Sequence, residues 1–411
     1  MNKRFALPTI LVIVSALLAG CWDQVQIEER GFVVGIAIDV PRTKEVEKRA
    51  AKEAPRKPKV KQRFLVTHQL VIPGGLIAGS QGGGGGGQNT TNEAFLNLAS
   101  EGDSLFEVSR ELATRTSRAP FYQHLKVLVI SEEVARTPDG FANAMDFLLR
   151  DPDSRRSGKV FISNGFAKSI IEVKPKTEKL PSLYINSIGE NIEKNARMLP
   201  EVRIGDIHED LLNPFSFVIP RVRAEKNEIK MAGSAVFSHD NQMVGFLGEE
   251  ETEGLNFLTG NIDGGLLKAK VKGDLVVLNI QGTKHEIVQD LRDKQNFKFT
   301  IKIECEGILA EAYALLDFLS KEETKKLERA FAKEIERMCL DTLQKVHKEM
   351  KVDVIKLGSN IRQKEYSLWK QIQKDWESGQ RLYEKSTIKV EAKVYLRNVG
   401  SINRSEKEEG R

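Results

Sequence analysis

Apolar side chains in the first half of the chain fall into short runs and alternations that are typical of strands. An unbroken run indicates a strand buried on both faces, and an alternation indicates a strand buried on one face. Four segments have one of these patterns: 32–38, 63–72, 125–130 and 160–162. Three segments between or after them have helical spacing: 105–112, a stretch after Pro138, and 167–171. This succession predicts a mixed α/β first domain.

Strand patterns dominate the middle of the chain. Three apolar segments follow each other closely: 216–225, 230–238 and 243–247. A short helix is predicted at 249–258, and its first turn carries three glutamates, which complement the positive end of the helix dipole. Another strand-like segment extends over 266–280. These patterns predict a small unit that is rich in β structure.

The last part of the chain combines two strand patterns with one long amphipathic helix. Alternating apolar residues predict strands at 297–305 and 388–396. Between them, Ser320 and Glu323 form a capping box that opens a helix of about 30 residues. One face of this helix is apolar: Leu327, Phe331, Ile335, Met338, Leu343, Val346 and Met350. A shorter helical stretch follows around Leu368, Ile372 and Trp376.

Together these patterns predict an α+β protein, with three mixed α/β domains in series and a long helix packed on a sheet in the last one. The expected division is as follows: a signal peptide at 1–20, an N-terminal α/β domain at 21–205, a small middle β-rich domain at 206–285, a C-terminal α+β domain at 286–403, and a charged tail at 404–411. Two irregular insertions are expected in the first domain, a basic loop at 41–62 and a Gly-rich loop at 73–92.

The N-terminus has the three-part organisation of a secretory signal peptide. Lys3 and Arg4 precede an apolar stretch, and small residues then lead to Cys21. Small residues directly before a cysteine resemble the lipobox of bacterial lipoproteins. We therefore expect cleavage before Cys21, which would carry an S-diacylglycerol group and an N-acyl chain. An uncleaved anchor is the alternative, but the apolar stretch is shorter than the ~20 residues that a spanning helix needs.

Charge is concentrated in one insertion. The chain carries 63 basic and 58 acidic residues, a net charge of +5. The segment 42–61 alone contains nine basic and three acidic residues, so the basicity is local and does not indicate a nucleic-acid-binding protein. This segment is expected either to contact anionic lipid headgroups or to be a solvated loop. The six glycines at 82–87 lack the Lys-Ser or Lys-Thr pair of a phosphate-binding loop, which favours a linker.

The sequence contains no recognisable constellation of catalytic or metal-binding residues. No two of the six histidines lie within five residues of each other, which excludes helical or hairpin metal-ligand spacing. His68 continues the apolar face of a predicted strand and is expected in the core. Cys305 and Cys339 are expected as buried free thiols, with a disulfide as the alternative. The sequence therefore predicts no enzyme, no cofactor and no metal, and no catalytic, cofactor-binding or metal-ligating residue.

Four ordered blocks of the chain resemble the Ger(x)C family of spore germination lipoproteins, the C subunits of nutrient germinant receptors. The blocks are Cys21-Trp22-Asp23 with residues 31–39; residues 124–130 with 147–151; residues 233–237 with 243–245 and Glu251-Thr252; and Asp353-Val354, Leu357-Gly358, Trp369 and Trp376. They span nearly the whole mature chain. The basic and Gly-rich insertions have no counterpart in this pattern, so nothing carries over to them.

The resemblance implies a lipoprotein, anchored by acyl chains such as palmitate, on the outer, extracytoplasmic face of the spore's inner membrane (a cell membrane). It would act with integral-membrane A and B type subunits in a complex that responds to amino acids or sugars and triggers germination. Family members are not known as enzymes, and Cys21 alone has a site role that transfers.

Two further function classes stay open from the residues alone. A solute-binding lipoprotein of a transporter would need two similar lobes around a cleft, whereas the pattern predicts three unlike units. An envelope hydrolase would need a nucleophile or a metal site. For the receptor subunit, the long C-terminal helix and the segment with Trp369 and Trp376 are expected to dock on a partner, or else the two tryptophans belong to the core.

Overall fold

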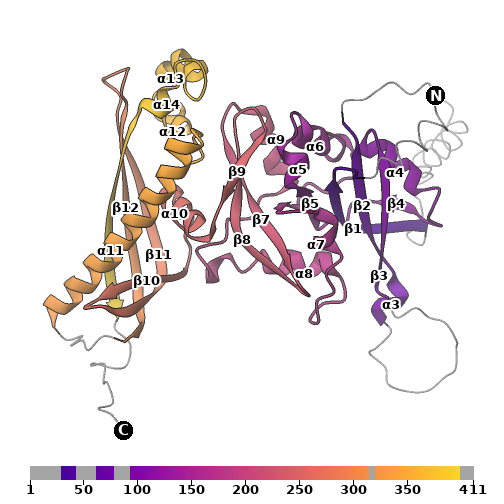
Figure 1. Ribbon diagram of the computed structural model, residues 1–411, viewed down its shortest axis with the longest axis horizontal. Helices are drawn as coiled ribbons and strands as arrows, with labels where there is room; N and C mark the ends of the chain where they lie inside the picture. The colour runs from indigo at the N-terminus through magenta and orange to yellow at the C-terminus, as the bar shows by residue number, and fades with distance from the viewer. Residues whose placement is uncertain (1–28, 43–61, 78–92, 314–319, 399–411) are drawn as a thin grey trace, which may run out of the picture.

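The computed structural model describes residues 29–42, 62–77, 93–313 and 320–398. Within these ranges, Figure 1 shows two sheets that follow each other along the longest axis of the molecule. The long helix α11 (Lys321–Leu343) lies against the second sheet. The predicted fold class, an α+β protein of mixed α/β units with a long helix packed on a sheet, is confirmed.

The first sheet has a parallel centre with antiparallel strands on either side. Its strand order is β3-β2-β1-β5-β6-β7-β8-β9, and β4 pairs with β1 outside this path. The strands are β1 (Arg30–Asp39), β2 (Phe64–Val71), β3 (Phe95–Gly102), β4 (Ala119–Phe121), β5 (Val127–Ser131), β6 (Lys159–Ser163), β7 (Phe217–Glu225), β8 (Glu228–Phe237) and β9 (Met243–Leu247). The neighbours β1, β5, β6 and β7 are parallel, and every residue of β5 and β6 is buried.

Helices cover both faces of this sheet, which explains why every residue of β5 and β6 is buried and most of them are apolar. One face packs against α4 (Leu105–Leu112), α5 (Glu132–Arg136), α6 (Gly140–Arg150) and α9 (Ile204–Leu212). The other face packs against α7 (Ala167–Ile171) and α8 (Pro181–Ile188). The helix α4 is capped at its N-terminus by Ser104, whose Oγ accepts a hydrogen bond from the Glu107 amide at 3.2 Å.

The second sheet has the order β10-β11-β12-β13. Its strands are β10 (Gly265–Val271), β11 (Asp274–Asp290), β12 (Lys298–Ala312) and β13 (Thr387–Asn398). The last two are parallel, so the chain must cross over between them. This crossover contains α11, a π-helical turn η3 (Gln344–Glu349), α12 (Leu357–Lys364), α13 (Tyr366–Ile372), the 3-10 turn η4 (Gln373–Asp375) and α14 (Leu382–Lys385).

Several sequence expectations were incomplete. The segment 266–280 forms two antiparallel strands, because Lys272 and Gly273 adopt the positive φ values, 54° and 92°, that a tight hairpin turn requires. The strand β3 has mostly half-buried residues and therefore no clear alternation. The expectation of an irregular loop throughout 73–92 was wrong at its start, where α3 (Pro73–Ile77) is a short helix. Residues 78–92 lie outside the described part.

The strands of the expected middle domain at 206–285 are divided between the two sheets. The strands β7, β8 and β9 continue the first sheet, whereas β10 and β11 begin the second. The helix α10 (Glu249–Thr259) connects these two groups along the chain. The proposed boundaries at 205 and 285 stay a prediction. Among the helices that the structure describes, none is both long enough and apolar enough to cross a bilayer.

Candidate functional site at the junction of the two sheets

The helix α10 lies between the first sheet and α11 (Figure 1). Residues 252–258 of this helix are all buried, so it has no solvent-exposed face over that stretch. On the side of the first sheet, the Thr252 hydroxyl lies 3.0 Å from the hydroxyl of Ser234 on β8. On the other side, Thr342 Oγ1 on α11 lies 2.9 Å from the backbone oxygen of Glu251. The helix is therefore a physical link between the two sheets.

The three glutamates of its first turn contact different parts of the molecule. Glu249 forms ion pairs on the side of the first sheet, with Lys230 and Arg223 on neighbouring strands. Glu250 lies 3.7 Å from Arg337 on α11, and Glu251 forms an ion pair with Lys345 on η3 at 2.7 Å. The hydrogen bond from Lys230 lowers the pKa of Glu249. In addition to the predicted dipole effect, this turn holds the two halves together electrostatically.

Glu253 forms an ion pair at the centre of this junction, in which the carboxylate is buried and Arg197 is partly exposed. Its side chain is only 4% exposed, and its carboxylate accepts a hydrogen bond from Arg197 Nε at 3.1 Å. Burial raises the pKa of Glu253, and the arginine opposes that shift by favouring the charged form. A charge this deeply buried is tolerated only with its partner, so the pair fixes the position of α10 against the segment before α9.

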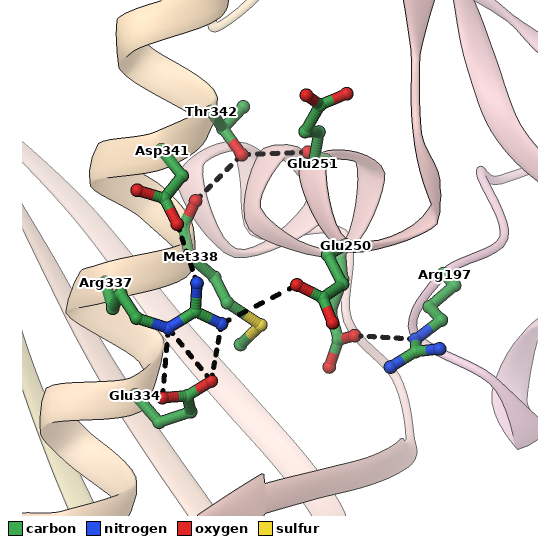
Figure 2. Close-up of polar contacts among 9 residues, drawn as sticks. Arg197, Glu250, Glu251, Glu334, Arg337, Met338, Asp341 and Thr342 are labelled. Carbon is green, nitrogen blue, oxygen red and sulfur yellow. Dashed lines mark hydrogen bonds and ion pairs between the residues drawn. The ribbon is translucent and has the colours of Figure 1, made fainter.

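The backbones of α10 and α11 touch at Gly254. A Cβ atom at this position would lie 2.3 Å from Thr342 Oγ1 and 2.5 Å from the backbone oxygen of Met338. Only glycine permits this approach. Figure 2 shows the neighbouring polar contacts, in which Arg337 of α11 meets Glu334 and Asp341 of its own helix and Glu250 of α10. The bonds with Glu334 hold the pKa of Arg337 above its usual value.

A second junction joins the start of β7 to the helices that follow α11. Ser216 Oγ donates a hydrogen bond to Glu377 Oε1 at 2.5 Å, and the same oxygen accepts the amide of Asp353 at 2.6 Å. Asp353 is itself buried and accepts hydrogen bonds from two backbone amides and from Trp376 Nε1 at 2.8 Å. Burial raises the pKa of Asp353 to about 7 and also raises that of Glu377.

Trp369 and Trp376 belong to the core, which was one of the two readings left open. Both side chains are buried, and Trp369 stacks on Phe215, which lies just before β7, with ring centroids 5.2 Å apart. They therefore stabilise the second junction from within and present no indole ring to a partner.

The described residues offer no evident chemistry for catalysis. His68 is buried, as expected, and lies 3.2 Å from the hydroxyl of Tyr122; burial lowers its pKa to about 4. Cys305 and Cys339 are buried free thiols, as expected, and burial raises the pKa of Cys305 to about 12. Within the described ranges, no group of three or more His, Cys, Asp or Glu side chains is placed to hold a metal ion.

Two expected sites fall on residues outside the described part. Cys21 precedes residue 29, where the description begins, and most of the basic loop, 43–61, is likewise outside it. At the loop's first residue, the Arg42 guanidinium lies over the ring of Phe166, 3.6 Å from its centroid. Lipid attachment at Cys21 and contact of the basic loop with headgroups stay predictions. The sequence analysis did not predict the two junctions. It explained the glutamates at 249–251 by their place in the first turn of a helix, and that explanation required no distant partner.

Comparisons with known proteins cover nearly the whole chain. A family model described as "Spore germination protein N-terminal domain" matches residues 23–224, and one described as "Spore germination B3/ GerAC like, C-terminal" matches residues 232–400. Spore germination protein YndF of Bacillus subtilis (strain 168) is 29% identical over 98% of both chains. Spore germination protein B3 of the same organism is 24% identical over 96% of this chain and 98% of its own.

A solved structure, "Crystal Structure of the GerBC protein", has a similar fold. The TM-score is 0.57 at 22% sequence identity, and the match covers 92% of this chain and all of the other. At this level of identity the likeness concerns the fold alone.

Proposed function

Because the chain belongs to the GerC-type family of spore germination proteins, we propose that it is the lipid-anchored, non-catalytic C subunit of a spore germinant receptor, required for the response to nutrient germinants. The observation that carries this proposal is the succession of the two family domains, at 23–224 and 232–400, along one chain. If only one of the two family domains matched this chain, the support for the proposal would be much weaker.

The proposed anchor is a lipid on Cys21. The match to the N-terminal family domain begins at residue 23, two residues after this cysteine. Two acyl chains, at roughly 0.8 kcal/mol per buried CH2 group, would hold the protein stably on a bilayer, where one chain would be marginal. The subunit would then face outward from the spore's inner membrane, and the basic loop at 42–61 would lie near anionic headgroups.

The proposed partners are integral-membrane A and B type subunits. A common membrane surface raises the effective concentration of the subunits beside each other, so modest contacts suffice for assembly. On this chain, the solvent-exposed face of α11 is the docking surface that we favour, because the tryptophan-containing segment behind it is buried in the core. The junctions at α10 and at Glu377 would keep the two sheets in a fixed relation while they bind.

A non-catalytic role fits the chemistry of the described residues. Both thiols are buried with pKa values raised by burial, which disfavours the nucleophilic thiolate. The alternative function, a solute-binding lipoprotein of a transporter, would be supported by tight binding of a free amino acid or sugar to the isolated full chain in calorimetry. We expect no such binding.

Deletion of the gene tests the proposal directly. Spores that lack it should lose germination in response to at least one nutrient of a panel of amino acids and sugars, and the wild-type gene should restore it. Non-nutrient triggers, such as high pressure or a cationic surfactant, should act equally on both kinds of spore and serve as the control. Normal germination with every nutrient would contradict the proposal.

A further inference from the structure

A basic groove of about 960 Å³ lies between β10 and α11, on the second sheet. Among the described residues that line it, seven of twelve are lysine or arginine, and one, Glu334, is acidic. The apolar residues of its lining are Ala269, Val271, Leu275 and Ala330. Such an excess of one charge around a hollow favours a ligand of the opposite charge.

Only part of this positive charge is neutralised. Ion pairs occupy three of the seven basic residues: Lys272 with Glu323, Lys326 with Glu322, and Arg337 with Glu334. The other four are exposed, and within the described part of the chain they form no ion pair: Lys268, Lys270, Arg329 and Lys333. Their cationic groups are therefore available to a ligand.

The arrangement of these cations has a local cost. Arg329, Lys333 and Arg337 follow each other at intervals of four residues on α11, so their like charges repel along one face of the helix. Lys268 and Lys270 add two more cations at the edge formed by β10, where they alternate with the buried Ala269 and Val271 and therefore lie on the face away from α11. Nothing in the fold requires this concentration of positive charge, since α11 packs on the sheet through apolar side chains and through Glu328 and Glu336, which accept hydrogen bonds from amides of β13.

The strand β10 is also an edge strand. Within the described residues it pairs with β11 alone, which leaves the backbone N–H and C=O groups along its other side without a strand partner. An extended polypeptide can add to such an edge through main-chain hydrogen bonds, while its side chains are selected by the adjacent surface. Here the adjacent surface is the basic groove.

We propose that this groove binds an extended, acidic polypeptide segment of a partner protein, which pairs with the free edge of β10 and places its carboxylates against Lys268, Lys270, Arg329 and Lys333. A flat bilayer would reach only the rim of the groove, whereas an extended chain fills it and also satisfies the strand edge. This inference adds a peptide-binding site to the proposed receptor role. It defines the partner by the extended, acidic character of its segment.

Peptide binding to the purified full chain tests this proposal. The probe is a dye-labelled octapeptide of the repeat Glu-Glu-Val-Val, which presents carboxylates on both faces of an added strand, and the reference is the same peptide with Gln in place of Glu. We expect fluorescence anisotropy to show binding of the Glu peptide, at least tenfold weaker binding of the Gln peptide, and weakening by added salt. Hydrogen exchange of residues 266–271 should slow when the Glu peptide is bound.

Charge reversal locates the binding surface. The double variants Arg329→Glu/Lys333→Glu and Lys268→Glu/Lys270→Glu should each bind the Glu peptide at least tenfold more weakly. All four substituted side chains are exposed, and the first double variant also removes the repulsion between position 333 and Arg337. Both variants should therefore fold, which circular dichroism checks. Lys389→Glu/Lys393→Glu on β13, the opposite edge of the same sheet, is the matched control and should bind within twofold of wild type.

Three results would overturn the proposal. One is the absence of peptide binding by the wild-type chain. Another is equal weakening by the β13 control variant, which would indicate attraction to the general charge of the domain. The third is binding of a soluble, short-chain phosphatidylglycerol through the same four residues when the peptide does not bind, which would assign the groove to lipid headgroups.

Discussion

At the scale of single residues, the most informative groups are carboxylates buried where two distant parts of the chain meet. Glu253 is held by Arg197, and Asp353 by backbone amides and Trp376. Because water does not solvate these groups, their charged forms depend on a few named partners. Substitution of one partner at a time, with measurement of the free energy of unfolding, therefore shows how much each junction contributes to stability.

Replacement of Arg197 by alanine should destabilise the protein strongly. Glu253 would then lie buried without its cation, and breaking a buried pair costs about 3–5 kcal/mol in the free energy of unfolding. Arg150→Ala is the control, because that arginine pairs with Asp146 on the surface and is 78% exposed. An exposed pair of this kind contributes about 0.3–0.5 kcal/mol. Denaturant unfolding measures both, and similar losses in the two variants would contradict this account of the junction.

Stability should fall as the pH rises from about 4 to about 7, in part because of Asp353. Its folded pKa of about 7 lies above the value of about 3.9 for an unfolded aspartate, so the folded state binds more protons throughout this window. Glu377→Gln keeps the Oε1 acceptor for Ser216 and removes a neighbouring charge. This variant should be more stable than wild type by about 1–2 kcal/mol at pH 8, with a smaller gain at pH 5.

Denaturant unfolding at pH 5, 6, 7 and 8 checks this expectation. The exposed Glu178 offers a matched control, since Glu178→Gln should follow the wild-type curve within about 0.5 kcal/mol at each pH. A gain for Glu377→Gln that is the same at every pH would show that the buried charges are not its cause.

Some residue environments could be predicted from the sequence, and others could not. His68 and Cys305 continue the apolar face of a local alternation, so their burial is visible in the pattern itself. The partners of Glu253 and Asp353 are distant in the sequence: Arg197 for Glu253, and Trp376 and Glu377 for Asp353. No local pattern encodes such contacts, and a glutamate in the first turn of a helix usually needs no further partner.

At the scale of elements, α10 is the helix that links the first sheet to α11. Its close approach to α11 depends on Gly254, and Gly254→Ala should therefore destabilise the protein by about 1–3 kcal/mol through overpacking. Gly205→Ala in α9 is a matched helical control, because a Cβ there meets nothing closer than 3.6 Å. That change should be neutral or stabilising by up to about 1 kcal/mol. Equal effects on the thermal midpoint would argue against close helix packing at Gly254.

Elements with strong local periodicity were the ones that the sequence predicted well. The long helix was predicted from the apolar residues spaced along one face between Leu327 and Val346, and these residues are buried as expected. The strand β3 was missed because most of its residues are half-buried. The pairing of β7 with β6, which attaches a predicted middle unit to the first sheet, is a long-range contact that periodicity does not reveal.

At the scale of the whole molecule, the proposed function requires a surface that meets a receptor subunit. A photoreactive side chain introduced at Leu340, which is 52% exposed on α11, should capture an integral-membrane subunit in intact spores. The same group at Phe106, which is similarly exposed on α4 in the first sheet's half, should capture less. Capture from Phe106 alone would contradict docking through α11.

The central claim is that acyl chains on Cys21 hold a germination subunit at the membrane. Mass spectrometry of the N-terminal peptide, from protein purified out of the spore inner membrane, tests this most directly. The account predicts a chain that begins at Cys21, with a diacylglycerol on the thiol and an acyl group on the amine. An intact leader, or an unmodified Cys21 in protein recovered from the soluble fraction, would contradict it.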